Sequence, residues 1–331
     1  MSKLLYLALA VCLNGVAFAQ FAPQAGISGS TAVAANSTSI VNWANSCQIK
    51  RGYMDIAQPD LGNTMAGDET LALGPADNFI VSLGDSGVAT LSFPLPITNG
   101  PGADFVVFEN GFINPDNAEE AYLELAFVEV SSDGVNFFRF PSISQTQTEL
   151  QIAGAGEFMN TRTIHNLAGK YISGYGTPFD LEDLAGTPGL DITHVTHVRI
   201  VDVVGSLESK YHQYDAHMNV INDPYPTPFP TGGFDLDAVG VIHQNSITYS
   251  QELARHSYAI YPNPTYGNVS FKTTTNTSVQ FSLYNTLGQK LWDGSLSSGE
   301  IIPTESLAPG VYYLKISDAQ GLLWTEKLLR L

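Results

Sequence analysis

Short apolar runs alternate with polar turn clusters along nearly the whole chain. Val, Ile, Phe and Tyr fill the runs, and Gly, Pro, Asn and Asp fill the clusters between them. This spacing is typical of β-strands joined by tight turns, and a helical period appears only as short turns at 161–168 and 181–184. The pattern predicts an all-β protein built on a large antiparallel β-sandwich, with its surplus residues in loops at 110–122, 141–193 and 205–233.

The clearest strand pair lies at residues 123–140. Alternating apolar residues lead into Asp133-Gly134, a pair that readily supplies the positive φ angles of a tight hairpin turn. Further strands of the large domain are expected at 79–83, 88–93, 105–109, 197–204 and 235–243.

A second, smaller domain is expected at residues 259–331. Residues 247–258 before it are polar and without period, which predicts a linker after a domain at 20–246. Its strands are expected at 268–273, 278–285, 289–293, 300–303, 311–316 and 322–329. A domain of this length and spacing favours a small Ig-like β-sandwich.

This last domain carries a series of short motifs: Tyr261-Pro262-Asn263-Pro264, a turn with Gly288, the segment with Gly310 and Tyr312, and a basic end at Lys327 and Arg330. The series resembles the type A C-terminal sorting domain of proteins exported by type IX secretion. That resemblance implies partners in the type IX machinery, removal of the tail, and often attachment to surface lipopolysaccharide of a Gram-negative bacterium. An ordinary adhesive Ig-like module is the alternative.

The first residues have the features of a secretory signal peptide. Lys3 precedes an apolar run at 4–13, and Ala17-Phe18-Ala19 offers a cleavage site before Gln20. The run is too short to span a bilayer, and no later segment is expected to do so. Cys12 leaves a lipoprotein signal open as an alternative. The prediction is a protein that is secreted or held at the cell surface.

The remaining cysteine, Cys47, has no partner for an internal disulfide if residues 1–19 are removed. A small buried hydrophobe is the more economical interpretation than a reactive thiol.

Charge is unevenly distributed. The whole chain carries −18, whereas residues 259–331 hold five basic and five acidic residues and are neutral. About −19 is therefore left on residues 20–258. Such a surface repels nucleic acid and anionic membranes and suits a partner of opposite sign, such as a hard cation.

The large domain has a resemblance of its own. Leu73–Asp77, Val81–Phe93 and the Val130–Gly134 hairpin resemble the opening of galactose-binding-like jelly rolls. Asp104–Phe112 and Gly233–Val241 are similar to uncharacterised bacterial cell surface proteins. The resemblance implies a secreted β-sandwich without an established activity.

Acidic and amide side chains near the ends of the last strands of this domain predict a calcium site. Carboxylate and carbonyl oxygens are the ligands that Ca²⁺ prefers, and an ion would stabilise long loops that lack disulfides. The alternative is turn chemistry, in which Asp and Asn bond their own backbone. The candidate ligands are Asp202, Asp215, Asn219, Asp223, Asp235 and Asp237.

Two further groups of polar residues are weaker candidates. Asp104, Glu109 and the loop at 110–120 could form a second ion site or a sugar-contacting edge, or a solvated acidic loop. His194 and His197 stand three apart, so on a strand they point to opposite faces and disfavour a shared zinc ion.

An aromatic strip is the candidate ligand surface. Rings exposed in the 205–233 loop would stack on sugar faces, or they would pack the loop onto the sandwich. The residues are Tyr211, Tyr214, Tyr225 and Phe229.

No nucleophile motif or distinctive pair of acids indicates catalysis. The sequence therefore favours a non-catalytic surface module that binds a ligand, with carbohydrate the leading class. A structural or adhesive surface component, a secreted hydrolase, and an accessory protein in nutrient capture, for example of a vitamin, are the alternatives.

Overall fold

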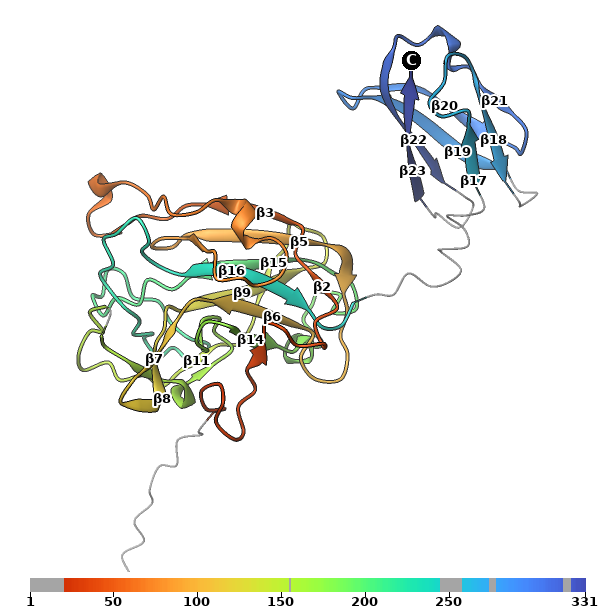
Figure 1. The fold of residues 1–331 in the computed structure, drawn as a ribbon. Helices are drawn as coiled ribbons and strands as arrows, with labels where there is room; N and C mark the ends of the chain where they lie inside the picture. The colour runs from red at the N-terminus through yellow and green to blue at the C-terminus, as the bar shows by residue number, and fades with distance from the viewer. Residues whose placement is uncertain (1–20, 155, 245–257, 274–277, 318–322) are drawn as a thin grey trace, which may run out of the picture. The chain divides into compact units, whose positions relative to one another are not determined.

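The computed structural model describes residues 21–154, 156–244, 258–273, 278–317 and 323–331 (Figure 1). The chain divides into two compact units between Asn245 and Ser246. Both are built from antiparallel strands, and within the described ranges the only helical pieces are short 3-10 turns. The predicted signal peptide at 1–19 lies outside the described residues, as does the predicted linker up to residue 257.

Two antiparallel sheets form the body of the large unit. The first has the order β1-β14-β6-β16-β2, with β4 beside β16, and the second has the order β10-β9-β15-β5-β3. The strands of the first are β1 (Val33–Ala34), β2 (Asn42–Trp43), β4 (Val81–Ser82), β6 (Phe105–Glu109), β14 (Tyr175–Phe179) and β16 (Asp235–Val241). Those of the second are β3 (Ser46–Lys50), β5 (Val88–Ile97), β9 (Ala126–Ser131), β10 (Phe138–Arg139) and β15 (Val195–Asp202). The predicted β-sandwich is confirmed.

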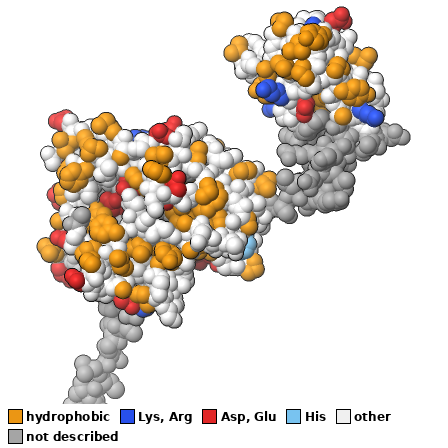
Figure 2. All heavy atoms as spheres, in the orientation of Figure 1, with side chains coloured by type: hydrophobic (Ala, Val, Ile, Leu, Met, Phe, Trp, Pro, Cys, Tyr) orange, Lys and Arg blue, Asp and Glu red, His pale blue; other side chains and the backbone are white. Residues whose placement is uncertain are grey.

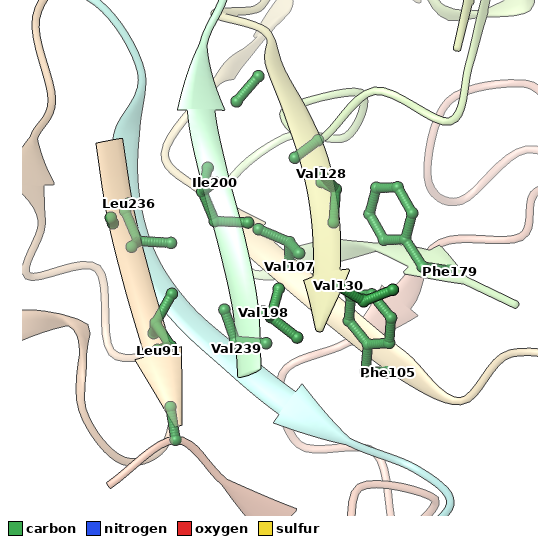
Figure 3. Close-up of a cluster of buried hydrophobic side chains, with 14 of the residues drawn as sticks. Leu91, Phe105, Val107, Val128, Val130, Phe179, Val198, Ile200, Leu236 and Val239 are labelled. Carbon is green, nitrogen blue, oxygen red and sulfur yellow. The ribbon is translucent and has the colours of Figure 1, made fainter. Parts of the chain in front are cut away.

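The main core lies between these two sheets. In Figure 3, side chains from β5, β9 and β15 meet those from β6, β14 and β16. The rings of Phe105 and Phe179 stack with centroids 5.3 Å apart, and Phe140 meets both edge-on. Each such aromatic side chain removes a large apolar surface from water, which is the main stabilising contribution to the unit.

Both sheets are also covered on their outer faces. The N-terminal segment places Ile40 and Trp43 over Val106 and Phe108 of β6. Long loops cover Phe127 and its neighbours on the other sheet, through a cluster that includes Ile152, Met159, Ile164 and Ile221. Because both faces are covered, every residue of β6, β9 and β16 is buried, and apolar residues there do not alternate strictly with exposed polar ones.

A β-bulge interrupts β16. The pairing with β6 shifts register between Leu236 and Ala238, so Asp237 is the extra residue. Leu236 and Val239 both enter the main core, whereas Ala238 packs in the cluster on the opposite face. Strict alternation would place Leu236 and Ala238 on one face, but the bulge resets the alternation and puts them on opposite faces.

The three segments predicted as loops contain short elements. Segment 110–122 forms the hairpin of β7 (Phe112–Asn114) and β8 (Asn117–Tyr122), seen at the lower left of the large unit in Figure 1. Segment 141–193 contains β11 (Ile143–Ser144), β12 (Met159–Asn160), β13 (Ile164–His165) and the 3-10 turns η3 (Thr161–Thr163) and η4 (Leu181–Leu184), besides β14. Segment 205–233 has an isolated bridge between Tyr214 and Val220. The 3-10 turns η1 (Pro59–Leu61) and η2 (Glu69–Ala72) lie outside the three segments. Pairs of two residues are too short to show a period in sequence.

The predicted hairpin at 123–140 forms between β9 and β10. Gly134 has a φ of 75°, as the turn requires. Asp133 contributes differently: its carboxylate accepts hydrogen bonds from the backbone of Val135 and Asn136, both at 2.8 Å. These bonds hold the pKa of Asp133 well below its usual range.

The small unit is a second sandwich, with sheets of order β17-β18-β21 and β20-β19-β22-β23. Its elements are β17 (Tyr258–Tyr261), β18 (Val269–Thr273), β19 (Val279–Asn285), β20 (Lys290–Leu296), β21 (Ile301–Ile302), η5 (Thr304–Ser306), β22 (Gly310–Ser317) and β23 (Leu323–Arg330). β17 was not anticipated, because its four residues adjoin the polar segment. Tyr258 therefore belongs to this unit and not to a linker.

Cys47 lies on β3 and faces the main core, with 8 % of its surface exposed. Burial raises the pKa of its thiol to about 12, so it remains protonated. It is a buried apolar residue, as expected.

Figure 2 shows the surface consequence of the uneven charge. Asp and Glu side chains recur over the visible face of the large unit, while Lys and Arg are prominent on the small unit.

Candidate functional site

Six buried carboxylates of the large unit influence one another electrostatically, and we call them the acid cluster. Three lie at or just after strand ends: Glu109 at the end of β6, Asp202 at the end of β15 and Asp235 at the start of β16. The other members are Asp85, Glu124 and Asp223. Strand ends from both sheets therefore bring acids from distant parts of the sequence together.

The pKa of every carboxyl in the cluster is raised. Burial is the largest cause throughout, because it disfavours the ionised form. The neighbouring acids add to the rise: Asp235 and Glu109 act on Glu124. The pKa of Asp235 is about 6 and that of Asp85 about 7.

Hydrogen bonds hold these carboxylates in place. Asp202 accepts bonds from the backbone N–H of Ser86 and Phe234, at 2.9 and 2.7 Å. Asp235 accepts from the Ser82 hydroxyl at 2.5 Å and the Asn110 amide at 3.0 Å. The donors are all neutral, so the negative charge of the cluster is solvated only by dipoles.

Two fully buried oxygens of the cluster remain without a donor in the described part of the chain. Among the described residues, Glu109 Oε1 and Asp223 Oδ1 are buried and have no hydrogen-bond partner. Their sister oxygens are bonded, Glu109 Oε2 to Gly111 N at 2.8 Å and Asp223 Oδ2 to Leu125 N at 3.0 Å. An unpartnered buried oxygen is costly and indicates a missing proton or ligand.

Basic side chains do not compensate the cluster. No ion pair that the described residues form involves its six acids. Glu129 offers a contrast inside the same unit, since this buried acid pairs with both Arg139 and Arg199. Within the described part of the chain no three His, Cys, Asp or Glu side chains converge as a ready-made metal site.

A cavity of about 500 Å³ adjoins the cluster, and we call it the Phe112 pocket. Glu124 and Asp235 belong to both the cluster and the pocket wall. The remaining wall comes from Asn110, Phe112, Tyr122, Ala153, Gly154, Pro226, Thr227, Phe229 and Thr231. Its volume falls within the range of roughly 300–1,000 Å³ that is usual for small-molecule sites.

Aromatic rings form the apolar part of this wall. Phe112 stacks on Tyr122 with centroids 5.0 Å apart and meets Phe158 edge-on at 6.2 Å. Phe112 is 47 % exposed and Phe229 is 59 % exposed, so both present a face to solvent. The Tyr122 hydroxyl donates to Glu124 Oε1 at 3.2 Å, which joins the aromatic wall to the acid cluster.

The position of Phe229 follows from a tight turn before β16. Its N–H donates to Thr227 O at 2.7 Å, and the next residue, Pro230, accepts bonds from Met65 and Ala66. Gly233 closes the turn with a φ of 70°. The turn thereby holds the Phe229 ring at the rim of the pocket.

The predicted calcium ligands separate into three groups. Asp202, Asp223 and Asp235 belong to the acid cluster. Asp237 instead fixes a distant loop, accepting from Asp77 N and Asn78 N at 3.1 and 3.2 Å.

The third group, Asp215 and Asn219, forms a turn. The Asp215 carboxylate accepts from Ser144 N, His217 N and both the backbone and side chain of Asn219, at 2.8–3.0 Å. Burial alone would raise its pKa, but these bonds hold the pKa of Asp215 below its usual value. Asp215 and Asn219 therefore follow the alternative of turn chemistry.

The four predicted aromatic residues do not form one strip. Tyr225 is 4 % exposed, lies 6.4 Å from the Tyr211 ring and points its hydroxyl at Asp55, 3.3 Å away. It packs the loop, and an exposed role for it is wrong. Tyr214 is exposed beside His212, and Phe229 alone of the four lines the Phe112 pocket.

Sequence reasoning missed the most informative residues. The sequence pattern indicates Glu109 and the 110–120 loop as one possible sugar-contacting edge, but it does not indicate Phe112, Tyr122 or Glu124. Part of this site could have been predicted, because Tyr122 and Glu124 alternate with apolar residues along one stretch. A glutamate such as Glu124 inside an apolar run is unusual.

Other candidates have ordinary structural partners. Asp104 accepts from Gly100 N and Leu181 N and lies 2.8 Å from His243 Nδ1. A second cavity of about 360 Å³ is lined by Lys170, whose burial lowers its pKa to about 7. Lys170 Nζ donates to Ile164 O at 2.8 Å and so has a backbone partner.

The predicted sorting motifs lie on the small unit. Asn263 joins its segment to β23 by bonds to Lys327 O and Leu329 N, at 2.7 and 2.9 Å. Tyr312 is buried and donates to Ala308 O at 2.8 Å, and Gly288 has the φ of 74° that its turn requires. The other motif residues are Tyr261, Pro262, Pro264 and Gly310, with Tyr261 half exposed.

Residues 259–329 match the family model of the secretion system C-terminal sorting domain. The small unit is thus a sorting domain, which supports export by the type IX secretion system and a place outside the cell or at its surface. No helix among the described residues is long and apolar enough to cross a membrane. The class is an exported all-β protein with a C-terminal sorting domain.

No curated protein matches the chain. Among solved structures, Ruminococcus gnavus β-glucuronidase in complex with uronic isofagomine is 11 % identical, with a TM-score of 0.19 over 74 % of this chain and 35 % of the enzyme. Another structure of that enzyme gives 12 % identity, a TM-score of 0.19, and coverage of 78 and 39 %. This chain spans less than half the length of these enzymes, and at such TM-scores the likeness carries no functional information.

Proposed function

We propose that the large unit is a non-catalytic module that binds a carbohydrate in the Phe112 pocket outside the cell. The observation that carries the proposal is the pocket wall itself. Exposed rings of Phe112 and Phe229 offer apolar faces for a sugar ring, and Asn110, Asp235 and the threonines offer hydrogen-bonding groups beside them. The proposal also includes a galactose-binding-like jelly-roll fold for the large unit and attachment of the exported protein to surface lipopolysaccharide.

A glycan array with the purified protein, followed by calorimetry on the best ligand, tests it. Phe112→Ala should weaken binding by about tenfold or more, since losing ~1.4 kcal/mol of contact is a tenfold change in Kd. Phe79→Ala is the matched control, because Phe79 is 65 % exposed and does not line the pocket. Equal losses in both variants, or no binding to any glycan, would reject the proposal.

We also propose that a calcium ion binds within the acid cluster. Support comes from Asp202, Asp223 and Asp235, which are predicted ligands, act on one another electrostatically and form no ion pair among the described residues, and from the open oxygens of Glu109 and Asp223. The ion would complete its shell with carbonyl or water oxygens. Elemental analysis of the purified protein, and a rise in Tm on adding calcium after chelation that Asp223→Asn removes, are the expected results.

A further inference from the structure

We infer that the sugar bound in the Phe112 pocket carries a protonated amine, so that the ligand is an amino sugar with a free ammonium group. This deepens the proposed function and rests on it. The inference comes from the juxtaposition, in one cavity, of carboxylates and exposed aromatic rings without any basic side chain.

The first step concerns the charge of the wall. Glu124 and Asp235 line the cavity, and the pocket contains no Lys, Arg or His among its lining residues. Neutral sugars are bound equally well by amides and hydroxyls, which carry no cost of burying a charge. Two carboxylates in a wall without a base favour a ligand that brings the positive charge itself.

The second step concerns the oxygen that is left for the ligand. Both oxygens of Asp235 already accept from Ser82 and Asn110. Among the described residues, the one hydrogen bond to the Glu124 carboxylate is that from Tyr122 to Oε1. Glu124 Oε2 is therefore the open acceptor of the wall, and an ammonium group has three donors for it.

The third step concerns what lies behind the wall. Glu109 is 2 % exposed, and its Oε1 has no partner in the described part of the chain. Asp235 raises the pKa of Glu109, and Glu109 in turn raises the pKa of Glu124. A cation bound in the pocket would offset the burial and repulsion that raise these pKa values, so its binding favours the ionised form of the wall acids.

The fourth step concerns the rings. An ammonium group is attracted to the face of an aromatic ring, and the flat apolar side of a sugar stacks on the same kind of surface. Phe112 and Phe229 supply exposed faces, while Tyr122 links its ring to Glu124 through its hydroxyl. One amino sugar can satisfy both kinds of contact at once.

Glu129 shows that the chain has another way to handle a buried acid. Arg139 and Arg199 both form ion pairs with it, and each also lies over a phenylalanine ring at 3.9 Å. There, protein cations occupy the space between carboxylate and ring. The Phe112 pocket also combines carboxylates with aromatic rings, but no Lys, Arg or His is among its described lining residues. The ligand would therefore supply the cation.

The test compares sugars that carry a free amine, an acetylated amine or a hydroxyl group at the same position. Oligomers of glucosamine, of N-acetylglucosamine and of glucose are titrated into the purified protein by calorimetry, alongside cyclohexylammonium as a cation without a sugar. The free amine is expected to bind about tenfold or more tightly than its acetylated match, in line with the ~1.5–3 kcal/mol typical of hydrogen bonds to charged groups.

Variants assign the preference to the wall. Glu124→Gln retains an acceptor for Tyr122 and is expected to reduce the amine-to-acetyl ratio to about one, by removing the charge-assisted bond. Glu149→Gln is the control, because it makes the same charge change at an exposed position outside the pocket. Repeating the titrations with calcium and with a chelator shows whether calcium competes for the same oxygens.

The outcomes separate the two proposals. Neutral and acetylated sugars binding as tightly as the amine would overturn the inference and leave carbohydrate binding intact. Cyclohexylammonium binding without any sugar would retain the charge preference and reject the carbohydrate. No binding by any of the four would reject the inference, and the glycan array would then decide the carbohydrate proposal.

Discussion

At the scale of single residues, burial of acids without bases is the property that sets the chemistry of the large unit. Burial raises the pKa of every acid in the cluster, and neighbouring acids raise those of Glu124 and Asp202 further. The folded protein therefore binds protons more strongly at these sites than the unfolded chain does. Protonation and stability must then be linked.

Asp85 gives the simplest test of that linkage. Its pKa rises from 3.8 to about 7, through burial and the charge of Asp55, while Ile56 N donates to it at 2.7 Å. Because folding raises the pKa of Asp85, proton binding to Asp85 stabilises the folded protein in full at pH values below its ordinary pKa of 3.8. This stabilisation is lost as the pH rises toward the folded value.

Asp85→Asn is therefore expected to gain stability over the native protein as the pH rises from 5 to 8. The difference should approach the order of 1.4 kcal/mol for each unit of pKa shift that the window covers. Urea unfolding at several pH values, in the presence of a chelator, measures it. Asp68→Asn is the control without a pH trend in this window, because hydrogen bonds from Thr70 lower the pKa of Asp68 and the group is ionised in both states above pH 5. A gain that is independent of pH would contradict the linkage.

At the scale of elements, the ends of strands decide the site. β6, β15 and β16 each place a carboxylate of the cluster at a terminus. The turn before β16 then brings Phe229 to the rim and Gly233 against Asp202. A Cβ on Gly233 would lie 2.7 Å from Asp202 Oδ1 and 2.9 Å from the Gly84 backbone.

Gly233→Ala should consequently destabilise the large unit by about 3 kcal/mol, combining left-handed strain of about 1–2 kcal/mol with the clash. Gly74→Ala isolates the strain, because Gly74 has a similar φ of 82° and no atom within 4 Å of its added Cβ. Denaturant unfolding of both variants checks the expectation. Similar losses for the two would show that the contact with Asp202 is unimportant.

The sequence predicted the elements unevenly, for physical reasons. Long strands such as β5, β6 and β15 bury enough apolar residues to leave a pattern, and they were found. Two-residue strands and the bulge at Asp237 leave none, because tertiary contacts alone define them. The burial of Asp202 was foreseeable from its face of β15, whereas the roles of Phe112 and Glu124 depend on loops meeting in space.

At the scale of the molecule, each unit has a core of its own, and export and binding are assigned to different units. The sorting domain buries Phe271, Leu283 and Leu314 in a hydrophobic cluster of its own. The acid cluster and the Phe112 pocket belong entirely to the large unit. Changes in one unit should leave the task of the other intact.

Deleting residues 259–331 is expected to retain the protein inside the cell envelope without reducing ligand binding. Cell fractionation and immunoblotting measure the first effect, and calorimetry on the purified truncated protein measures the second. Phe112→Ala is the reciprocal control, with export retained and binding lost. Export of the truncated chain would contradict the role of the sorting domain.

The rate at which Cys47 reacts can report local opening of the second sheet at its edge strand β3. Its thiol is buried on β3, where β3 pairs with β5 at the edge of the second sheet, and its high pKa removes the reactive thiolate. In a Cys12→Ser protein, a maleimide is therefore expected to react with Cys47 only when β3 detaches. The labelling rate reports how often that edge strand opens, and a ligand or ion that stabilises the sandwich as a whole would slow it.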